Sequence, residues 1–259
     1  MKKGKGMKGK TALITGATSG IGKALSYSLA KNGVSLILTG RRKERLKEIK
    51  SDLEKKYKVK VQTLSFDISK KAETLSTLEK NKSALSKVDY LINNAGGAHG
   101  SDSFDKAEIS DFETMIDTNI KGLLYTTRFM VPLLKKKGEG HIINLGSVAG
   151  KWVYPNGSVY CATKHAVRAI SEGLRIDLNG TNIRVTDIEP GMVETEFALV
   201  RFKNDKAKAK KVYEGMKPLS PEDIAECIVW TLDRPAHVNI SEMVIFPTDQ
   251  ASVHLVNRK

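Results

Sequence analysis

The chain has 259 residues, 40% of them hydrophobic and 28% charged, which suits a folded protein of one large domain or two small ones. No apolar run approaches the ~18 residues that a membrane-spanning helix needs, so the composition predicts a protein without a membrane anchor. Two distant cysteines form no C-x-x-C pair and five scattered histidines form no H-x-x-x-H pair, so we predict no metal site.

The formal net charge of +14 raises the question of a nucleic-acid partner. The chain contains no recognised nucleic-acid motif, and aromatic residues are not interleaved with its basic runs. The basic run at residues 41–60 has the spacing of an amphipathic helix with lysines facing water. We therefore predict a solvated basic surface and no nucleic-acid partner. The lysine-rich start leads, after only a few apolar residues, into a glycine loop rather than a signal peptide, so the predicted location is cytoplasmic.

Seven short apolar runs along the chain predict strands. The runs are mostly continuous rather than alternating, which is typical of strands covered on both faces. They lie at residues 11–15, 34–39, 60–66, 88–93, 141–146, 182–190 and 241–246.

Helical segments alternate with these strands, near residues 20–32, 43–57, 69–84, 108–137, 158–179 and 220–233. The last begins with a clear signal, because Ser220 can cap it and Pro221 suits its first turn. The alternation predicts an α/β fold: a Rossmann-type doubly wound, seven-stranded parallel sheet with helices on both faces. We predict a single domain over residues 10–259, preceded by a lysine-rich extension at residues 1–9.

The first strand is followed by "TGATSGIGKA", in which Gly16, Gly20 and Gly22 form a variant of the dinucleotide-binding glycine pattern. Glycines let the backbone approach a diphosphate, and the start of the next helix offers free amides and partial positive charge. Ligands of such sheets bind beyond the carboxyl ends of the strands, where this loop lies. The loop therefore predicts a dinucleotide site.

The second strand ends in "TGRRKERL", where NAD sites carry an acidic residue that binds the ribose hydroxyls. Here Arg41 and Arg42 occupy the region, and the first carboxylate, Glu44, already lies on the helix. An arginine pair suits a ribose 2′-phosphate through charge-assisted hydrogen bonds. The two arginines therefore favour NADP(H) over NAD(H).

Two more loops after strands point to the same edge of the sheet. "FDIS" after the third strand places Asp67 where it can accept a hydrogen bond from an adenine amino group. "NNAGG" after the fourth strand brings Asn94 and Gly96 close to the same ligand. Each signal is weak alone, because ordinary turns have the same composition.

Tyr160 and Lys164 in "SVYCATKHA" lie one turn apart on a helix predicted to begin near Ser158. Bringing a tyrosine pKa from about 10 to ~7 needs ~4 kcal/mol of phenolate stabilisation. A positive charge at about 4 Å in an effective dielectric near 20 supplies roughly that amount. We predict that Lys164 ionises Tyr160 as a general base, while Ser147, after the fifth strand, holds the substrate oxygen.

The Y-x-x-x-K spacing also occurs at Tyr213–Lys217. Gly215 lies inside it, and Pro218 disfavours helical conformation at Lys217. This pair is therefore predicted to belong to a lid or a loop.

Taken in order, "TGATSGIG", "NNAG", "DTNIKG", "GS" at Ser147, "YCATK" and "EPGMVET" resemble the short-chain dehydrogenase/reductase family over residues 10–247. The resemblance implies that Asn119 supports a water relay to Lys164, that Ser147 positions the substrate and that Tyr160 transfers the proton. It also implies that Tyr160 and Lys164 contact the nicotinamide ribose. Further implied cofactor contacts are Thr18, Ser19, Ile21, Ile68, Pro190, Gly191, Val193 and Thr195.

"TGRRKERL", "VTDIEPGMVETEF" and "PEDIAE" are more closely similar to the NADP-dependent 3-hydroxy acid dehydrogenases, which also act on serine or allo-threonine or reduce malonic semialdehyde. That resemblance implies a small 3-hydroxy acid as substrate and a homotetramer. A substrate carboxylate needs a cation, for which Arg201 is the candidate, although a surface role in a basic loop fits it equally well.

Two other functions remain open on sequence grounds. A 3-oxoacyl carrier-protein reductase, or another NADPH-dependent carbonyl reductase, would share the catalytic set, but carrier-protein reductases usually have a glycine pair where this chain has "IFPTDQ". A non-catalytic NADP(H)-binding regulator would not need Asn119, Ser147, Tyr160 and Lys164 together.

Overall fold

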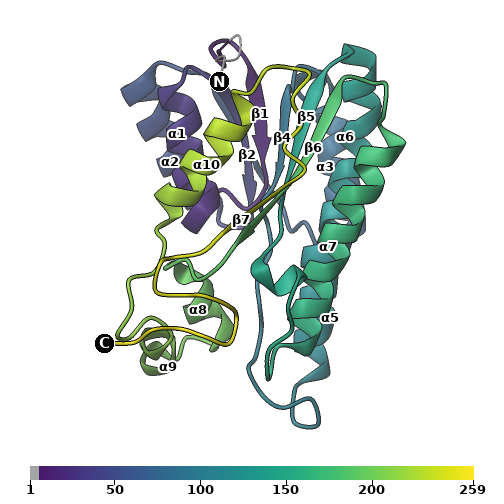
Figure 1. The fold of residues 1–259 in the computed structure, drawn as a ribbon. Coiled ribbons are helices and arrows are strands. Elements are labelled where there is room, and N and C mark those ends of the chain that lie inside the picture. Colours follow the sequence, from purple (N-terminus) through teal and green to yellow (C-terminus); the bar gives the residue numbers. More distant parts are fainter. Residues whose placement is uncertain (1–5) are drawn as a thin grey trace.

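The strands of the protein form a single parallel sheet in a computed structural model that describes residues 6–259 (Figure 1). The strand order is β3-β2-β1-β4-β5-β6-β7. The strands are β1 (Thr11–Ile14), β2 (Ser35–Gly40), β3 (Val61–Ser65), β4 (Tyr90–Asn93), β5 (Gly140–Leu145), β6 (Ile183–Pro190) and β7 (Glu242–Ile245). The order reverses direction between β1 and β4, which creates the crevice where ligands of doubly wound sheets bind.

Helices cover both faces of this sheet. One layer contains α1 (Gly20–Lys31), α2 (Lys43–Tyr57) and α10 (Pro221–Leu232), and the other contains α3 (Lys71–Lys80), α6 (Leu123–Lys137) and α7 (Ser158–Asp177) (Figure 1). Two separate groups of buried apolar side chains, one on each face, form the core. The predicted Rossmann-type fold class is confirmed.

Several shorter elements depart from the predicted pattern. The segment predicted as one helix over 69–84 is broken at Asn81 into α3 and α4 (Lys82–Leu85). The segment predicted over 108–137 contains a π-helical turn, η1 (Asp117–Gly122), between α5 (Ile109–Ile116) and α6. Three elements were not predicted: the 3₁₀ turn η2 (Val148–Gly150) and the short helices α8 (Glu196–Arg201) and α9 (Lys206–Lys211).

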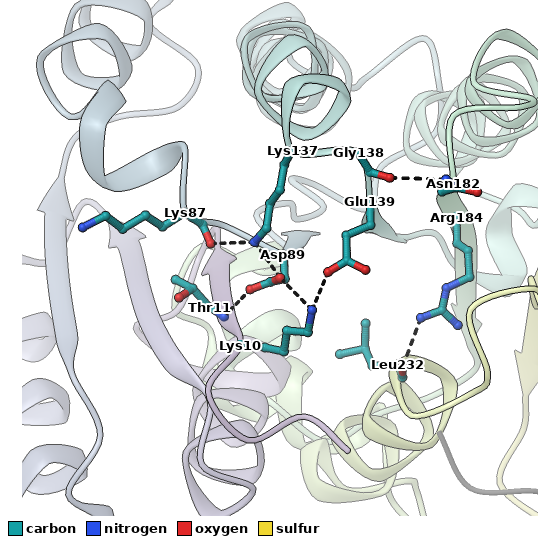
Figure 2. Close-up of polar contacts among 10 residues, drawn as sticks. All are labelled: Lys10, Thr11, Lys87, Asp89, Lys137, Gly138, Glu139, Asn182, Arg184 and Leu232. Carbon is teal, nitrogen blue, oxygen red and sulfur yellow. Dashed lines mark hydrogen bonds and ion pairs between the residues drawn. The ribbon is translucent and has the colours of Figure 1, made fainter. Parts of the chain in front are cut away.

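The amino ends of the strands are joined by a polar network centred on Asp89 (Figure 2). The Asp89 carboxylate accepts a hydrogen bond from the Thr11 amide at 2.8 Å and pairs with Lys10 at 3.1 Å and Lys137 at 2.6 Å. Lys10 also pairs with Glu139 at 2.5 Å. This network ties β1 to β4 and to the end of α6, on the side of the sheet away from the predicted ligand site.

The start of the described chain packs onto this domain. Met7 is buried in the core, and the Gly9 amide donates a hydrogen bond to the Gly33 carbonyl at 3.1 Å. The predicted extension at residues 1–9 lies partly outside the described residues, so its boundary stays a prediction. Within residues 6–259, no helix is long and apolar enough to cross a membrane, and no cluster of His, Cys, Asp and Glu is arranged to hold a metal ion.

Candidate active site

A cavity of about 570 Å³ opens at the carboxyl ends of the strands. With one exception, every residue predicted to bind the cofactor or the substrate or to act in catalysis lines this cavity. The exception is Asn119, which is buried behind the cavity wall. Residues from loops after β1 to β6 therefore converge on one site.

The glycine loop leaves no room for side chains. Gly16 has a positive φ of 67°, and a Cβ there would lie 2.8 Å from the Ala95 Cα atom. A Cβ on Gly22 would lie 2.5 Å from the Gly16 carbonyl oxygen. The loop leads into α1, which has no acidic residue in its first turn and whose N-cap, Ser19, makes no side-chain capping hydrogen bond. The start of α1 thus fits a diphosphate, because its free amides face the cavity with partial positive charge.

The two arginines after β2 have different surroundings. Arg42 donates to the Thr18 hydroxyl from Nε at 3.0 Å and from Nη2 at 2.7 Å, and Nη2 also lies 2.6 Å from the Ser19 hydroxyl. Its Nη1 pairs with Glu196 at 2.6 Å, as does Arg45 at 2.7 Å. Arg41 is 73% exposed, and its nearest acidic group is Asp67 at 3.9 Å. Together Arg41 and Arg42 give one end of the cavity the cations and hydroxyls that a phosphate requires.

Asp67 and Asn94 both shape the loops in which they lie. One Asp67 carboxylate oxygen accepts hydrogen bonds from the Ser69 amide at 3.0 Å and its hydroxyl at 2.7 Å. The Asn94 side-chain amide donates to the carbonyls of Thr15 at 2.9 Å and Gly16 at 3.1 Å. Asn94 therefore fastens the loop after β4 to the glycine loop, in addition to lining the cavity.

Asn119 sits on the π-helical turn and holds the neighbouring loop in place. Its side chain accepts a hydrogen bond from the Gly97 amide at 2.9 Å, and donates to the Gly97 carbonyl at 2.9 Å and to the Thr163 hydroxyl at 3.0 Å. Gly96 lies just in front of it, since a Cβ there would be 3.0 Å from Asn119 Oδ1 and 3.7 Å from Lys164 Nζ. Gly96 thus keeps the space between Asn119 and Lys164 open.

The loops after β5 and β6 form the opposite wall. The Ser147 hydroxyl accepts a hydrogen bond from the Ala149 amide at 3.1 Å, which fixes its position at the start of η2. Pro190 ends β6, and the Gly191 amide donates to the Ile245 carbonyl at 2.7 Å. Thr195 caps α8 and faces the glycine loop, because a Cβ on Gly20 would be 3.3 Å from the Thr195 methyl group.

Tyr160 and Lys164 are both buried on the inner face of α7. Lys164 Nζ donates to the Leu145 carbonyl at 2.7 Å and lies 5.9 Å from the centroid of the Tyr160 ring. Burial lowers the pKa of Lys164 to about 8, an effect opposed by the charge of Asp187. Burial also raises the pKa of Tyr160, and a hydrogen bond with Ser147 opposes this rise. Desolvation of the phenolate therefore opposes the predicted ionisation of Tyr160 by Lys164, which stays a prediction.

A family model described as short chain dehydrogenase matches residues 10–206. The chain belongs to the short-chain dehydrogenase family. This confirms the family predicted from its motifs.

Individual relatives within the family are similar over nearly the whole chain. The chain is 46% identical to the NADP-dependent 3-hydroxy acid dehydrogenase YdfG of Salmonella typhi, over 93% of this chain and 98% of the relative. It is also 46% identical to sulfoacetaldehyde reductase 2 of Chromohalobacter salexigens, over 92% and 94% of the two chains. A solved structure, the closed form of serine dehydrogenase in complex with NADP+, aligns with a TM-score of 0.90 and 44% identity, over 96% of this chain and 100% of that one.

Arg201, the predicted carboxylate ligand, lies at the end of α8 and lines the cavity. Its guanidinium donates to the Gly100 carbonyl at 3.1 Å, the Tyr154 hydroxyl at 3.0 Å and the Asn156 carbonyl at 3.3 Å. These contacts fasten α8 to two loops across the cavity. A guanidinium carries five N–H donors, so Arg201 keeps capacity for an anion.

Among the cavity-lining residues that sequence reasoning missed, four make the following contacts. Phe197 packs edge-on against Tyr160 with ring centroids 5.6 Å apart, and Tyr154 supports Arg201. Gln250 accepts a hydrogen bond from the Met192 amide at 2.8 Å, and Glu196 joins α8 to α2. Only Phe197 and Glu196 had a signal, because they follow Thr195 directly in "VETEF".

Proposed function

We propose that the protein is an NADP-dependent oxidoreductase that interconverts small 3-hydroxy acids, of the serine, allo-threonine or 3-hydroxypropionate type, and the corresponding 3-oxo acids. The observation that carries the proposal is the convergence of Ser147, Tyr160 and Lys164 in one cavity whose other end holds Arg41 and Arg42. The names of the relatives, which include a 3-hydroxy acid dehydrogenase and a serine dehydrogenase, support it.

The residues present suit NADP as the cofactor. The glycine loop and the start of α1 would hold the diphosphate, and the arginine pair would hold the 2′-phosphate. Thr195 faces the glycine loop and would close the diphosphate site from the other side. When bound, the nicotinamide supplies the hydride acceptor for oxidation and the hydride donor for reduction.

The proton chemistry belongs to the protein. In oxidation, ionised Tyr160 takes the substrate hydroxyl proton as the carbon–hydrogen bond breaks and the carbonyl forms. In reduction, Tyr160 returns this proton to the developing alkoxide, while the Ser147 hydroxyl donates a hydrogen bond to the same oxygen. Lys164 supplies positive charge behind Tyr160, and Asn119 fixes the loop in front of Lys164.

We propose that the protein selects short substrates that carry an anionic group. The relatives named for hydroxy acids, serine and sulfoacetaldehyde share a short substrate with a carboxylate or a sulfonate. In this chain Arg201 is the cation that lines the substrate end of the cavity beside Phe197. We therefore assign recognition of the substrate anion to Arg201.

A homotetramer in the cytoplasm is part of the proposal. Exposed apolar side chains on α5 to α7 and on α10 and β7 support further association: Ile116, Leu124, Ile176, Trp230 and Val244. Size-exclusion chromatography with light scattering tests this directly, with a mass near four chains expected and a monomer contradicting it.

The function is tested by absorbance at the reduced-nicotinamide band. L-serine, L-allo-threonine, 3-hydroxypropionate and 3-hydroxyisobutyrate are each offered with NADP+ and with NAD+. We expect turnover of at least one of these acids, with NADP+ preferred. Absence of turnover, together with NADPH-dependent reduction of an acetoacetyl thioester, would instead make the protein a carrier-protein reductase.

A further inference from the structure

Strand β6 carries two buried carboxylates. Asp187 and Glu189 are both fully buried, and none of their four oxygens has a hydrogen-bond partner within residues 6–259. Leaving buried carboxylates without hydrogen bonds is costly, so their presence calls for an explanation. The catalytic set described above uses neither of them.

The register of the sheet places Asp187 directly behind the catalytic loop. Asp187 is paired with Asn144 on β5 and with Glu242 on β7. Its carboxylate packs against Gly146, the residue before Ser147, so closely that a Cβ on Gly146 would collide with it. Lys164 Nζ donates to the carbonyl of Leu145, the residue before Gly146. Asp187 and Lys164 therefore approach the same short stretch of backbone.

The charged groups on this face of the sheet form a balanced cluster. Its carboxylates are Asp187, Glu189 and Glu242, and its cations are Lys151, Lys164 and Arg168. Lys151 pairs with Glu242 at 2.5 Å and with Glu189 at 3.5 Å, and Arg168 Nε pairs with Glu242 at 3.1 Å. These contacts compensate Glu189 and Glu242 at the outer end of the cluster, which leaves Asp187 and Lys164 as the inner pair.

We propose that Asp187 is a positioning residue for the reaction, whose carboxylate is the counter-ion that keeps Lys164 positively charged behind Tyr160. This inference rests on the proposed function and adds a group to its catalytic machinery. Burial disfavours the ammonium form of Lys164, and no carboxylate forms a direct ion pair with it among the described residues. A buried carboxylate one strand behind the loop supplies the missing negative charge without entering the cavity.

The protonation equilibria agree with this geometry. Burial lowers the pKa of Lys164, and the charge of Asp187 opposes this lowering. Burial raises the pKa of Asp187 to about 7, and the neighbouring charge of Glu189 adds to this rise, whereas Lys164 opposes it. Asn144, which faces Asp187 from β5, is neutral and donates to the Ser171 hydroxyl. The two inner groups thus titrate in adjacent pH ranges and are expected to titrate as a coupled pair.

The pH profile of kcat/KM distinguishes this role from a packing role. Asp187→Asn removes a negative charge without changing the shape of the side chain, so the pKa of Lys164 should fall. We expect the alkaline limb of the profile, which follows Lys164, to move to lower pH by about one pH unit. The matched control is Glu189→Gln, on the same strand face and equally buried, which should move the profile by less than half as much. A uniform loss of activity with unmoved limbs would overturn the proposal.

A titration of the wild-type protein tests the same coupling without substrate, and a variant is needed only to assign the resonance. Lysines are methylated with ¹³C-formaldehyde, and Lys164 is assigned by its absence in Lys164→Arg. The Lys164 resonance should show a second inflection at the pH where the Asp187 carboxyl titrates. A single-step titration would overturn the proposal. Failure of the turnover assay with the wild-type protein would contradict the proposed function. The outcome of the titration does not depend on that assay and is interpreted separately.

Discussion

Arg42 donates two hydrogen bonds to the Thr18 hydroxyl, from Nε and from Nη2, and so joins the loop after β2 to the glycine loop. Arg45 shares the acidic partner of Arg42, Glu196, but makes no hydrogen bond to the glycine loop within the described chain. Substitution of each arginine can therefore distinguish the contact with the glycine loop from the ion pair with α8.

Arg42→Ala should lower kcat/KM for NADP+ by about 10- to 100-fold, because a charge-assisted contact to phosphate contributes about 1.5–3 kcal/mol. The value for NAD+, which lacks the 2′-phosphate, should change much less. Arg45→Ala is the control and should leave the ratio of the two values within about threefold of wild type. Equal losses for both cofactors in Arg42→Ala would mean that Arg42 supports only the loop.

Gly96 and Gly97 offer a matched pair for testing the space in front of Lys164. A Cβ on Gly96 would press on Asn119 Oδ1 at 3.0 Å and approach Lys164 Nζ at 3.7 Å, whereas a Cβ on Gly97 would meet no atom within 4 Å. Gly96→Ala should therefore lower kcat by about tenfold or more, since small displacements of catalytic groups have large effects on rate. Gly97→Ala should retain most activity. Steady-state kinetics check both, and equal activity of the two variants would contradict this account of Gly96.

The fold was predictable because its strands are continuous apolar runs bounded by turns, and the motifs of the site follow those strands directly. The segment between residues 191 and 219 was not predictable to the same degree. The run "KAKAKK" has no apolar stripe, yet it forms α9, whose N-cap Asp205 accepts a hydrogen bond from the Lys208 amide at 3.0 Å.

The unpredicted parts of the site depend on contacts between distant loops. Tyr154 and Gln250 reach the cavity only because tertiary packing brings their loops to α8 and to the loop after β6. The burial of the Asp187 charge could not be predicted from the sequence either, because the run around it was predicted as a strand from its apolar residues.

Stability should depend on pH through Asp187. Its pKa rises from 3.8 to about 7 in the folded protein because of burial. Because the protonated carboxyl is the form that the folded protein favours, this group stabilises the fold fully below about pH 3.8, where it is protonated in both states. The stabilisation is lost as the pH rises through about 7, where the folded-state carboxyl ionises. The free energy of unfolding of the wild type should therefore fall between pH 4.5 and pH 7.5 relative to Asp187→Asn, which cannot titrate at this position. Urea denaturation of both proteins at the two pH values measures this, and a pH-independent difference would contradict it.

The network at the amino ends of the strands should contribute to stability but not to chemistry (Figure 2). Asp89 is only 7% exposed and pairs with both Lys10 and Lys137, so Asp89→Asn should lower the free energy of unfolding by about 2 kcal/mol. Glu139 pairs with Lys10 but is 56% exposed, and Glu139→Gln should change it by less than about 1 kcal/mol. Denaturant titration provides both numbers. Similar changes in the free energy of unfolding for the two variants would show that burial of Asp89 does not strengthen its ion pairs.

Tyr160 is proposed to transfer the proton, and Tyr160→Phe tests this most directly against Tyr213→Phe, a tyrosine that also has a lysine four residues later. The Tyr213 hydroxyl donates to the Val193 carbonyl at 2.9 Å and is predicted to stabilise only the loop. With the best hydroxy acid and NADP+, kcat/KM should fall by about 10²- to 10⁴-fold in Tyr160→Phe and by less than about fivefold in Tyr213→Phe. Cofactor affinity should change much less than kcat/KM in both variants. A Tyr160→Phe enzyme that keeps more than about a tenth of wild-type activity would contradict the account.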